Sequence, residues 1–276
     1  QLSLERLGEI HSKPNEEEDK GPDSDEQISG NQSIQLQDVF FTYGSEKSKK
    51  IIKGVSLNIP AGKTTAIVGL SGSGKTTLIK LMLGFYPPTE GKVCIGGQSL
   101  QDLSFKQWRK HCGVVMQEGF IFNDTIANNI APEDDTVDKK KLLYAVDMAN
   151  IRSFIETLPL KYNTRIGNTG QGVSQGQKQR ILIARAIYRN PDYLFFDEAT
   201  NALDTDNEKT IQRNLDQFFK DRTVVIVAHR LSTVRNADQI VVLKDGNITE
   251  QGNHDSLISQ QGDYYRLVKN QLELNA

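Results

Sequence analysis

Residues 69–76 read GLSGSGKT, and no other stretch of this sequence limits the possible folds so strongly. The pattern G-x-x-x-x-G-K-[ST], placed between a strand and a helix, forms a loop whose backbone N–H groups surround phosphate oxygens. Its glycines permit the turns, its lysine supplies charge to the β- and γ-phosphates, and its Thr hydroxyl can ligate Mg²⁺. We therefore predict a nucleotide site in which these residues contact the ligand: Gly69, Ser71, Gly72, Ser73, Gly74, Lys75, Thr76 and Thr77.

Short apolar stretches alternate with helix-like segments along most of the chain, with a helix expected over about 75–83. The predicted strands are Ile34–Phe41, Val55–Ile59, Thr64–Val68, Lys92–Ile95, Val114–Met116, Tyr193–Phe196, Thr223–Ala228, Ile240–Leu243 and Asn247–Glu250. This alternation predicts an α/β fold with a parallel sheet flanked by helices. Between Met116 and Tyr193 the sequence is polar, mostly helical and without a clear strand. That stretch predicts a helical subdomain inserted into the core, over about 118–190.

A pair of acidic residues, Asp197 and Glu198, follows the apolar strand Tyr193–Phe196. A buried strand that ends in a carboxylate is how proteins with such a phosphate loop hold Mg²⁺. We assign Asp197 to the metal. Because successive side chains of an extended backbone point in opposite directions, Glu198 can face an attacking water.

The first 32 residues differ from the rest of the chain. Leu2, Leu4, Leu7 and Ile10 have roughly helical spacing, and the segment that follows is acidic, contains Pro and Gly, and is almost without apolar residues. Such a segment cannot offset its ordering entropy by burial, so we predict a mobile linker over 1–32 and a folded domain over 33–276. Since the chain begins with Gln1 rather than Met, we interpret it as a fragment or a processed product.

Charge and hydropathy argue against several other classes of protein. The net charge of −2 gives no reason to expect a nucleic-acid partner. No apolar run approaches the roughly 18 residues of a membrane helix, and there is no signal peptide, so we expect a chain that is soluble when isolated. Cys94 and Cys112 lack metal-ligand spacing, and we interpret them as reduced thiols.

Together, the phosphate loop, the acidic pair and the motifs described next resemble the ATP-binding-cassette (ABC) family over nearly all of 34–272. The family's LSGGQ signature corresponds to VSQGQKQR at 173–180, with Gln175 in place of glycine and Val173 in place of leucine. The resemblance implies a P-loop NTPase core with an additional antiparallel β subdomain. It also implies a head-to-tail dimer, in which Ser174, Gly176 and Gln177 of one copy contact the γ-phosphate bound to the other.

The remaining motifs occur in the family's order. Tyr43 in FTYG is similar to the aromatic residue that stacks on adenine. Gln117 in VVMQ resembles the glutamine that senses Mg²⁺ and contacts the membrane domain. The sequence NALD at 201–204 resembles a loop at the dimer interface, and His229 in VIVAHR resembles the histidine near the γ-phosphate.

Two further stretches are similar to those of exporters: TRIGNTG at 164–170, where Asn168 replaces the usual glutamate, and FNDTIANNIAP at 122–132. With the signature variant, they resemble bacterial peptide and bacteriocin exporters that carry a peptidase domain. The resemblance implies that residues 1–32 lead from a transmembrane domain and that the chain acts at the cytoplasmic face of the plasma (inner) membrane. The implied partners are that membrane domain and a second ATP-binding domain, with a homodimer favoured.

The resulting hypothesis is an ATPase that uses ATP and Mg²⁺, with Glu198 polarising water while Lys75 and His229 stabilise charge on the γ-phosphoryl group. Two alternatives remain open. One is a soluble ABC ATPase unrelated to transport, whose chains generally carry two cassettes or a long coiled-coil insertion. The other is a nucleotide-dependent regulatory module with low turnover, suggested by Gln175 and Asn168. The measured rate of ATP hydrolysis distinguishes such a regulatory module from an ATPase.

Overall fold

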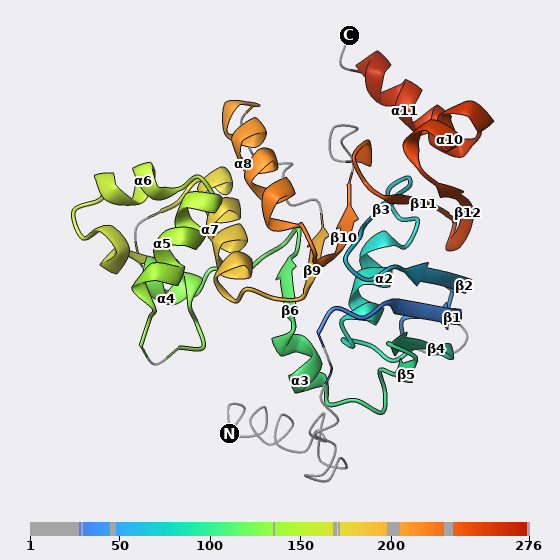
Figure 1. Ribbon diagram of the computed structural model, residues 1–276, viewed down its shortest axis with the longest axis horizontal. Coiled ribbons are helices and arrows are strands. Elements are labelled where there is room, and N and C mark those ends of the chain that lie inside the picture. The colour runs from blue at the N-terminus through green and yellow to red at the C-terminus, as the bar shows by residue number, and fades with distance from the viewer. Residues whose placement is uncertain are drawn as a thin grey trace, which may run out of the picture.

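The computed structural model describes residues 28, 30–44, 48–134, 136–167, 170, 172–197, 205–228 and 234–274. A six-stranded sheet with the strand order β12-β11-β3-β10-β9-β6 lies at its centre (Figure 1). Its strands are β3 (Thr64–Val68), β6 (Cys112–Val115), β9 (Tyr193–Asp197), β10 (Thr223–Val227), β11 (Gln239–Lys244) and β12 (Asn247–Gly252). All neighbours are parallel except β12, which runs antiparallel to β11. The predicted parallel sheet is therefore confirmed.

The central strands are apolar over most of their length because both of their faces are covered. In β9, Leu194 and Phe196 join one hydrophobic core, while Tyr193 and Phe195 join the other. The strands β3 and β10 divide their residues between the same two cores in the same alternating way. The central sheet thus separates two packed layers, and its carboxyl edge is the place where both can contribute to one site.

The first core lies between the central sheet and a second, antiparallel sheet with the order β2-β1-β4-β5. Its strands are β1 (Ile34–Phe41), β2 (Ile52–Ile59), β4 (Glu90–Ile95) and β5 (Gln98–Ser99). Helix α2 (Lys75–Met82) contributes Leu78, Ile79, Leu81 and Met82 to this core. Strand β2 begins three residues earlier than predicted, because Gly54, with φ 75°, is skipped in the pairing with β1 and interrupts the apolar alternation.

The second core packs against a group of helices that lie on the left in Figure 1. They are α4 (Ile126–Ile130), α5 (Lys139–Met148), α6 (Arg152–Thr157) and α7 (Gln175–Tyr188), with a 3₁₀ turn at Lys161–Asn163. The expectation of no strand in this region was wrong, because β7 (Asp124–Thr125) pairs with β8 (Arg165–Ile166). Two-residue strands have no alternation to recognise, and their partners are distant in sequence. The other helices are α3 (Phe105–Lys110), α8 (Thr205–Phe218), α10 (His254–Gln260) and α11 (Asp263–Leu274).

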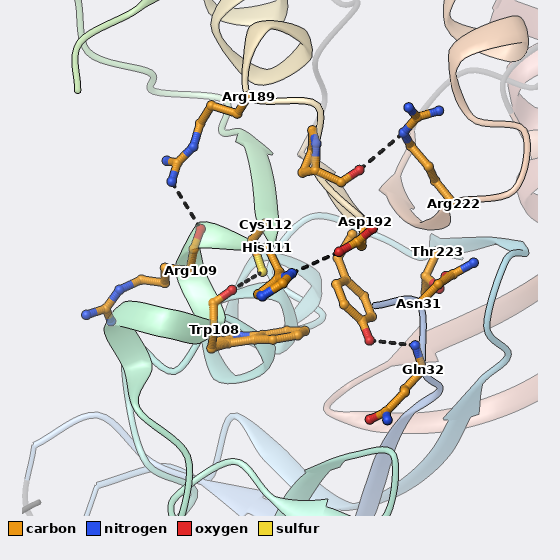
Figure 2. A network of polar contacts seen from close by, with 12 residues as sticks. Asn31, Gln32, Trp108, Arg109, His111, Cys112, Arg189, Asp192, Arg222 and Thr223 are labelled. Atoms are coloured by element: carbon orange, nitrogen blue, oxygen red, sulfur yellow. Dashed lines mark hydrogen bonds and ion pairs between the residues drawn. The ribbon is translucent and has the colours of Figure 1, made fainter. Parts of the chain in front are cut away.

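The last residues of the predicted linker are packed against the folded domain, whereas residues 1–27 and 29 lie outside the described part. The Asn31 side chain donates to the Asp221 carbonyl at 2.6 Å, and its Oδ1 accepts from the Gly62 N–H and the Thr223 hydroxyl. Figure 2 shows the adjoining contact, in which the Gln32 N–H donates to the buried Tyr193 hydroxyl. Asn31 and Gln32 thus contact the central sheet before β1 begins.

We expect Asn31→Ala to lower the free energy of unfolding by about 1–3 kcal/mol, because three groups lose a partner. The φ of Asn31 is 58°, a conformation that Asn tolerates better than Ala. Urea denaturation measures the change. The control is Asn247→Ala, since Asn247 is exposed and its side chain donates to the nearby Asp245 carbonyl at 3.3 Å; we expect an effect below about 0.5 kcal/mol. Equal effects of the two substitutions would show that Asn31 does not anchor this segment.

Candidate nucleotide site

The phosphate loop joins β3 to α2 and is fixed to the end of β11. The Gly246 N–H donates to the Ser73 carbonyl at 3.1 Å, and the Ser73 N–H donates to the Leu70 carbonyl. A Cβ at Gly69 would lie 2.1 Å from the Leu243 carbonyl oxygen, so only glycine fits there. This support by β11 could not be predicted, because the contact joins segments far apart in the chain.

Lys75, the first residue of α2, is buried beneath this loop. Its Nζ donates to the carbonyls of Gly69 at 3.0 Å and Leu70 at 2.9 Å. These bonds direct the ammonium group toward the phosphate loop, where it is predicted to contact the β- and γ-phosphates. A bound phosphate would therefore meet a cation already held in place.

The outer side of the loop is open to a ligand. Ser71 and Gly72 are exposed, and a Cβ at Gly72 would meet nothing within 4 Å. Helix α2 has Gly74 as its N-cap and is capped by no side chain in the described part of the chain, so its first N–H groups face the same opening. Beneath the loop, the buried Ser73 Oγ has no hydrogen-bond partner among the residues that the structure describes. An anion at this helix terminus would satisfy the N–H groups and interact favourably with the helix dipole.

The second residue of α2 meets the carboxyl end of β9. The Thr76 hydroxyl donates to Asp197 Oδ2 at 2.8 Å, and Asp197 is only 1% exposed. A hydroxyl and a carboxylate are the hard oxygen ligands that Mg²⁺ prefers, and this ion commonly takes only one or two ligands from the protein. The two residues therefore fit the predicted metal. Among the described residues, no three His, Cys, Asp or Glu side chains gather as a separate metal site.

Tyr43 follows β1 and lies beside the phosphate loop. Its hydroxyl lies 3.3 Å from the Thr77 hydroxyl, and its ring makes edge-to-face contacts with Phe41 and Tyr86. The residue is 39% exposed, which leaves part of the ring accessible. The structure thus brings together Tyr43, the phosphate loop and Asp197. Tyr86 was missed from the sequence because its contact with Tyr43 depends on tertiary packing.

Other predicted residues lie apart from the phosphate loop. Ser174, Gly176 and Gln177 start helix α7, which belongs to the helical layer, whereas α2 belongs to the layer of the antiparallel sheet (Figure 1). Ser174 and Gln177 form a capping box: the Ser174 hydroxyl accepts from the Gln177 N–H, and Gln177 Oε1 accepts from the Ser174 N–H.

The exchange of glycine for Gln175 is compatible with this helix start. Gln175 is the first helical residue of α7, and its φ is not positive. Gln117 lies just beyond β6 and is exposed. Glu198, His229, Asn168 and residues 201–204 lie outside the described residues.

Glu198 and His229 nevertheless follow neighbouring strands. Strand β9 ends at Asp197 and β10 ends at Val227, and these two residues are paired in the sheet. Both strands deliver the chain to the edge where β3 enters the phosphate loop. The fold and the described site therefore define a nucleotide-binding domain of the P-loop class.

Comparison with known proteins gives the family. A family model described as "ABC transporter" matches residues 52–201, just over half of the chain. The multidrug resistance protein pgp-1 of Caenorhabditis elegans is 46% identical over 235 residues, which are 85% of this chain and 18% of that protein. An ATP-dependent lipid A-core flippase of Haemophilus influenzae is 43% identical over 256 residues, 92% of this chain and 43% of the flippase.

A solved structure of a bacterial Atm1-family ABC exporter with ATP bound superimposes with a TM-score of 0.89 at 36% identity, over 98% of this chain and 47% of the exporter. The chain belongs to the ABC transporter family and is an ATPase domain of that family. It spans less than half the length of each of these relatives. Among the described residues, no helix has the length and apolarity needed to cross a membrane.

Proposed function

We propose that this chain is the ATP-hydrolysing motor of an ABC exporter. The observation that carries the proposal is the contact between Thr76 and Asp197, which places a hydroxyl and a buried carboxylate at the mouth of the phosphate loop. In this proposal, residues 1–32 join the domain to a transmembrane domain, and 33–276 form the ATP-binding domain with its helical part at about 118–190. The domain works at the cytoplasmic face of the membrane.

Within one copy, the phosphate loop binds and orients the nucleotide. The N–H groups of the loop and of the α2 terminus contact the phosphates, and Lys75 supplies charge to the β- and γ-phosphates. When bound by Thr76 and Asp197, with Gln117 nearby in the active state, Mg²⁺ supplies further positive charge to the same oxygens. Glu198 polarises the attacking water, and His229 stabilises charge on the γ-phosphoryl group. Catalysis by this arrangement consists mainly of positioning and electrostatic stabilisation.

A second copy completes each site in this proposal. Ser174, Gly176 and Gln177 start a helix of 14 residues, whose N-terminal dipole favours an anion. Because α7 and α2 belong to different layers of one chain, the head-to-tail pairing of two copies supplies the γ-phosphate contact. We propose a homodimer of equivalent sites that closes on ATP and opens after hydrolysis.

The cargo is a separate question. A peptide cargo, and a peptidase domain elsewhere in the exporter, rest only on the resemblance of the stretches 122–132 and 164–170 and of the signature variant at 173–180. The relatives reported above are a multidrug resistance protein and a lipid A-core flippase by name, and they give no support to peptide export. We therefore propose an exporter motor without assigning its cargo.

The test is Mg·ATP hydrolysis by the chain as a function of its concentration. If two copies form each site, the rate should rise faster than linearly with protein concentration until the dimer is saturated. A rate that remains proportional to concentration over the whole range, with no dimer detected by sedimentation, would contradict the role of Ser174–Gln177. Absence of turnover at all concentrations would favour the regulatory alternative.

A further inference from the structure

Three aromatic rings meet at the side of the phosphate loop. The centroid of Tyr43 lies 4.8 Å from that of Phe41 and 5.3 Å from that of Tyr86, with interplanar angles of 87° and 90°. Tyr86 also contacts Phe41, at 5.6 Å. Neither neighbour stacks in parallel on Tyr43, so both orient its ring without replacing a stacked base. We propose that Tyr86 is a positioning residue for the nucleobase: it holds Tyr43 in the orientation that receives adenine.

Tyr86 is suited to this role because the loop that carries it is stiff. On one side, the Phe85 N–H donates to the Lys80 carbonyl at the end of α2. On the other side, Pro87 and Pro88 restrict the backbone. The loop is then joined to the end of β1, since the Thr89 N–H donates to the Phe40 carbonyl at 2.8 Å.

A further bond joins this loop directly to the residue before Tyr43. The Thr42 N–H donates to Thr89 Oγ1 at 3.2 Å. The backbone on either side of the Tyr43–Tyr86 contact is therefore fixed as one unit, and the two rings meet without a rearrangement of the loop. The ring of Tyr86 can transmit this rigidity to Tyr43.

The exposed position of Tyr43 explains why the orientation of its ring needs such support. It lies just beyond the last residue of β1 and is 39% exposed, whereas Phe41 beneath it is only 5% exposed. An exposed ring at a strand end samples several orientations, and fixing one of them when a ligand binds costs conformational entropy. A neighbour that restricts the ring beforehand lowers this cost and raises the affinity for the base.

The inference rests on the proposed function, in which adenine stacks on Tyr43. It is tested by calorimetric binding of Mg·ATP and of inorganic tripolyphosphate, which carries the phosphates without the base. The variants of the full chain are Tyr86→Ala, Tyr86→Phe and Tyr43→Ala. Phe85→Ala, at the adjoining exposed aromatic residue, is the matched control.

We expect Tyr86→Ala to weaken ATP binding about three- to tenfold, the range corresponding to one aromatic pair, and to leave tripolyphosphate binding within about twofold. Tyr86→Phe should restore wild-type affinity, because the edge-to-face contact needs the ring and not the hydroxyl. In steady-state assays the KM for ATP should rise with kcat unchanged, since the base lies away from the reacting phosphate. Phe85→Ala should alter the affinity for neither ligand.

Unchanged ATP affinity in Tyr86→Ala would overturn the inference, as would an equal loss for both ligands, which indicates general damage to the loop. The Tyr43→Ala variant separates this failure from that of the proposed function. Suppose that Tyr43→Ala weakens the binding of ATP but not of tripolyphosphate while Tyr86→Ala changes neither affinity. In that case the stacking of adenine on Tyr43 stands and the role of Tyr86 is refuted. If neither variant weakens ATP binding more than tripolyphosphate binding, Tyr43 does not contact the base.

Discussion

Glu198→Gln is expected to retain ATP binding while losing at least about 100-fold in turnover, within the range attributed to general-base assistance. The reason lies in the residue that precedes it. Asp197 ends β9 in hydrogen-bond contact with Thr76, which fixes the carboxyl end of this strand at the phosphate loop. We therefore expect the carboxylate one residue further along the chain to act on the γ-phosphate side of the site, and Gln preserves its size while removing its basicity.

The measurement pairs Mg·ATP turnover with equilibrium ATP binding for the same protein. Glu156→Gln is the control, because Glu156 is an exposed carboxylate near Arg152, 3.7 Å away, on helix α6. We expect it to leave turnover unchanged. A loss below about fivefold in Glu198→Gln would rule Glu198 out as the base. Loss of ATP binding in this variant would instead assign the carboxylate to the ligand site.

The parts of the fold that could be predicted are those that depend on local sequence. The bounds of β1 and β3 agree with the prediction, since hydrophobic alternation marks the first and the following glycine loop marks the end of the second. The phosphate loop was recognisable because its glycines and lysine are contiguous. Asp197 could be placed beside Thr76 because parallel strands present their carboxyl ends at one edge.

The parts that could not be predicted depend on contacts between distant segments. The pairing of β7 with β8, the approach of Gly69 to Leu243 and the ring contact of Tyr43 with Tyr86 leave no periodic pattern in the sequence. The peptide cargo failed to gain support for a different reason. It was inferred from the signature variant and two exporter-like stretches of the ATP-binding domain, and segments of that domain carry no direct information about a transported molecule.

The start of α7 shows how a departure from the family pattern can be neutral for the fold. A glutamine at position 175 is acceptable because the helix begins there with the capping box of Ser174 and Gln177 already formed. The N–H groups of this first turn remain directed toward the helix terminus, as an anion site requires. In the proposed mechanism these N–H groups contact a phosphate bound to a second copy, and the competing possibility is a phosphate bound to the same chain.

Mixing two inactive variants answers this directly. Lys75→Ala removes the charge that serves the phosphates, and Gly176→Asp places a carboxylate in the first turn of α7. A carboxylate at this position is favourable for the helix, so Gly176→Asp should fold well while repelling the γ-phosphate. We expect each variant alone to lose at least about 100-fold in Mg·ATP turnover.

An equimolar mixture of the two variants should regain about a quarter of the wild-type rate, because half of the random dimers are mixed and each has one intact site of two. The matched control places both substitutions in one chain and mixes it with wild type; no mixed dimer then contains an intact site, and the rate per wild-type chain should fall. Mixed dimers that form without recovering activity would show that the two elements do not act across the interface. Full activity of Gly176→Asp alone would show that α7 does not contribute to the site. Recovery of activity in the mixture, in contrast, requires that Lys75 of one copy and Gly176 of the other act on the same nucleotide.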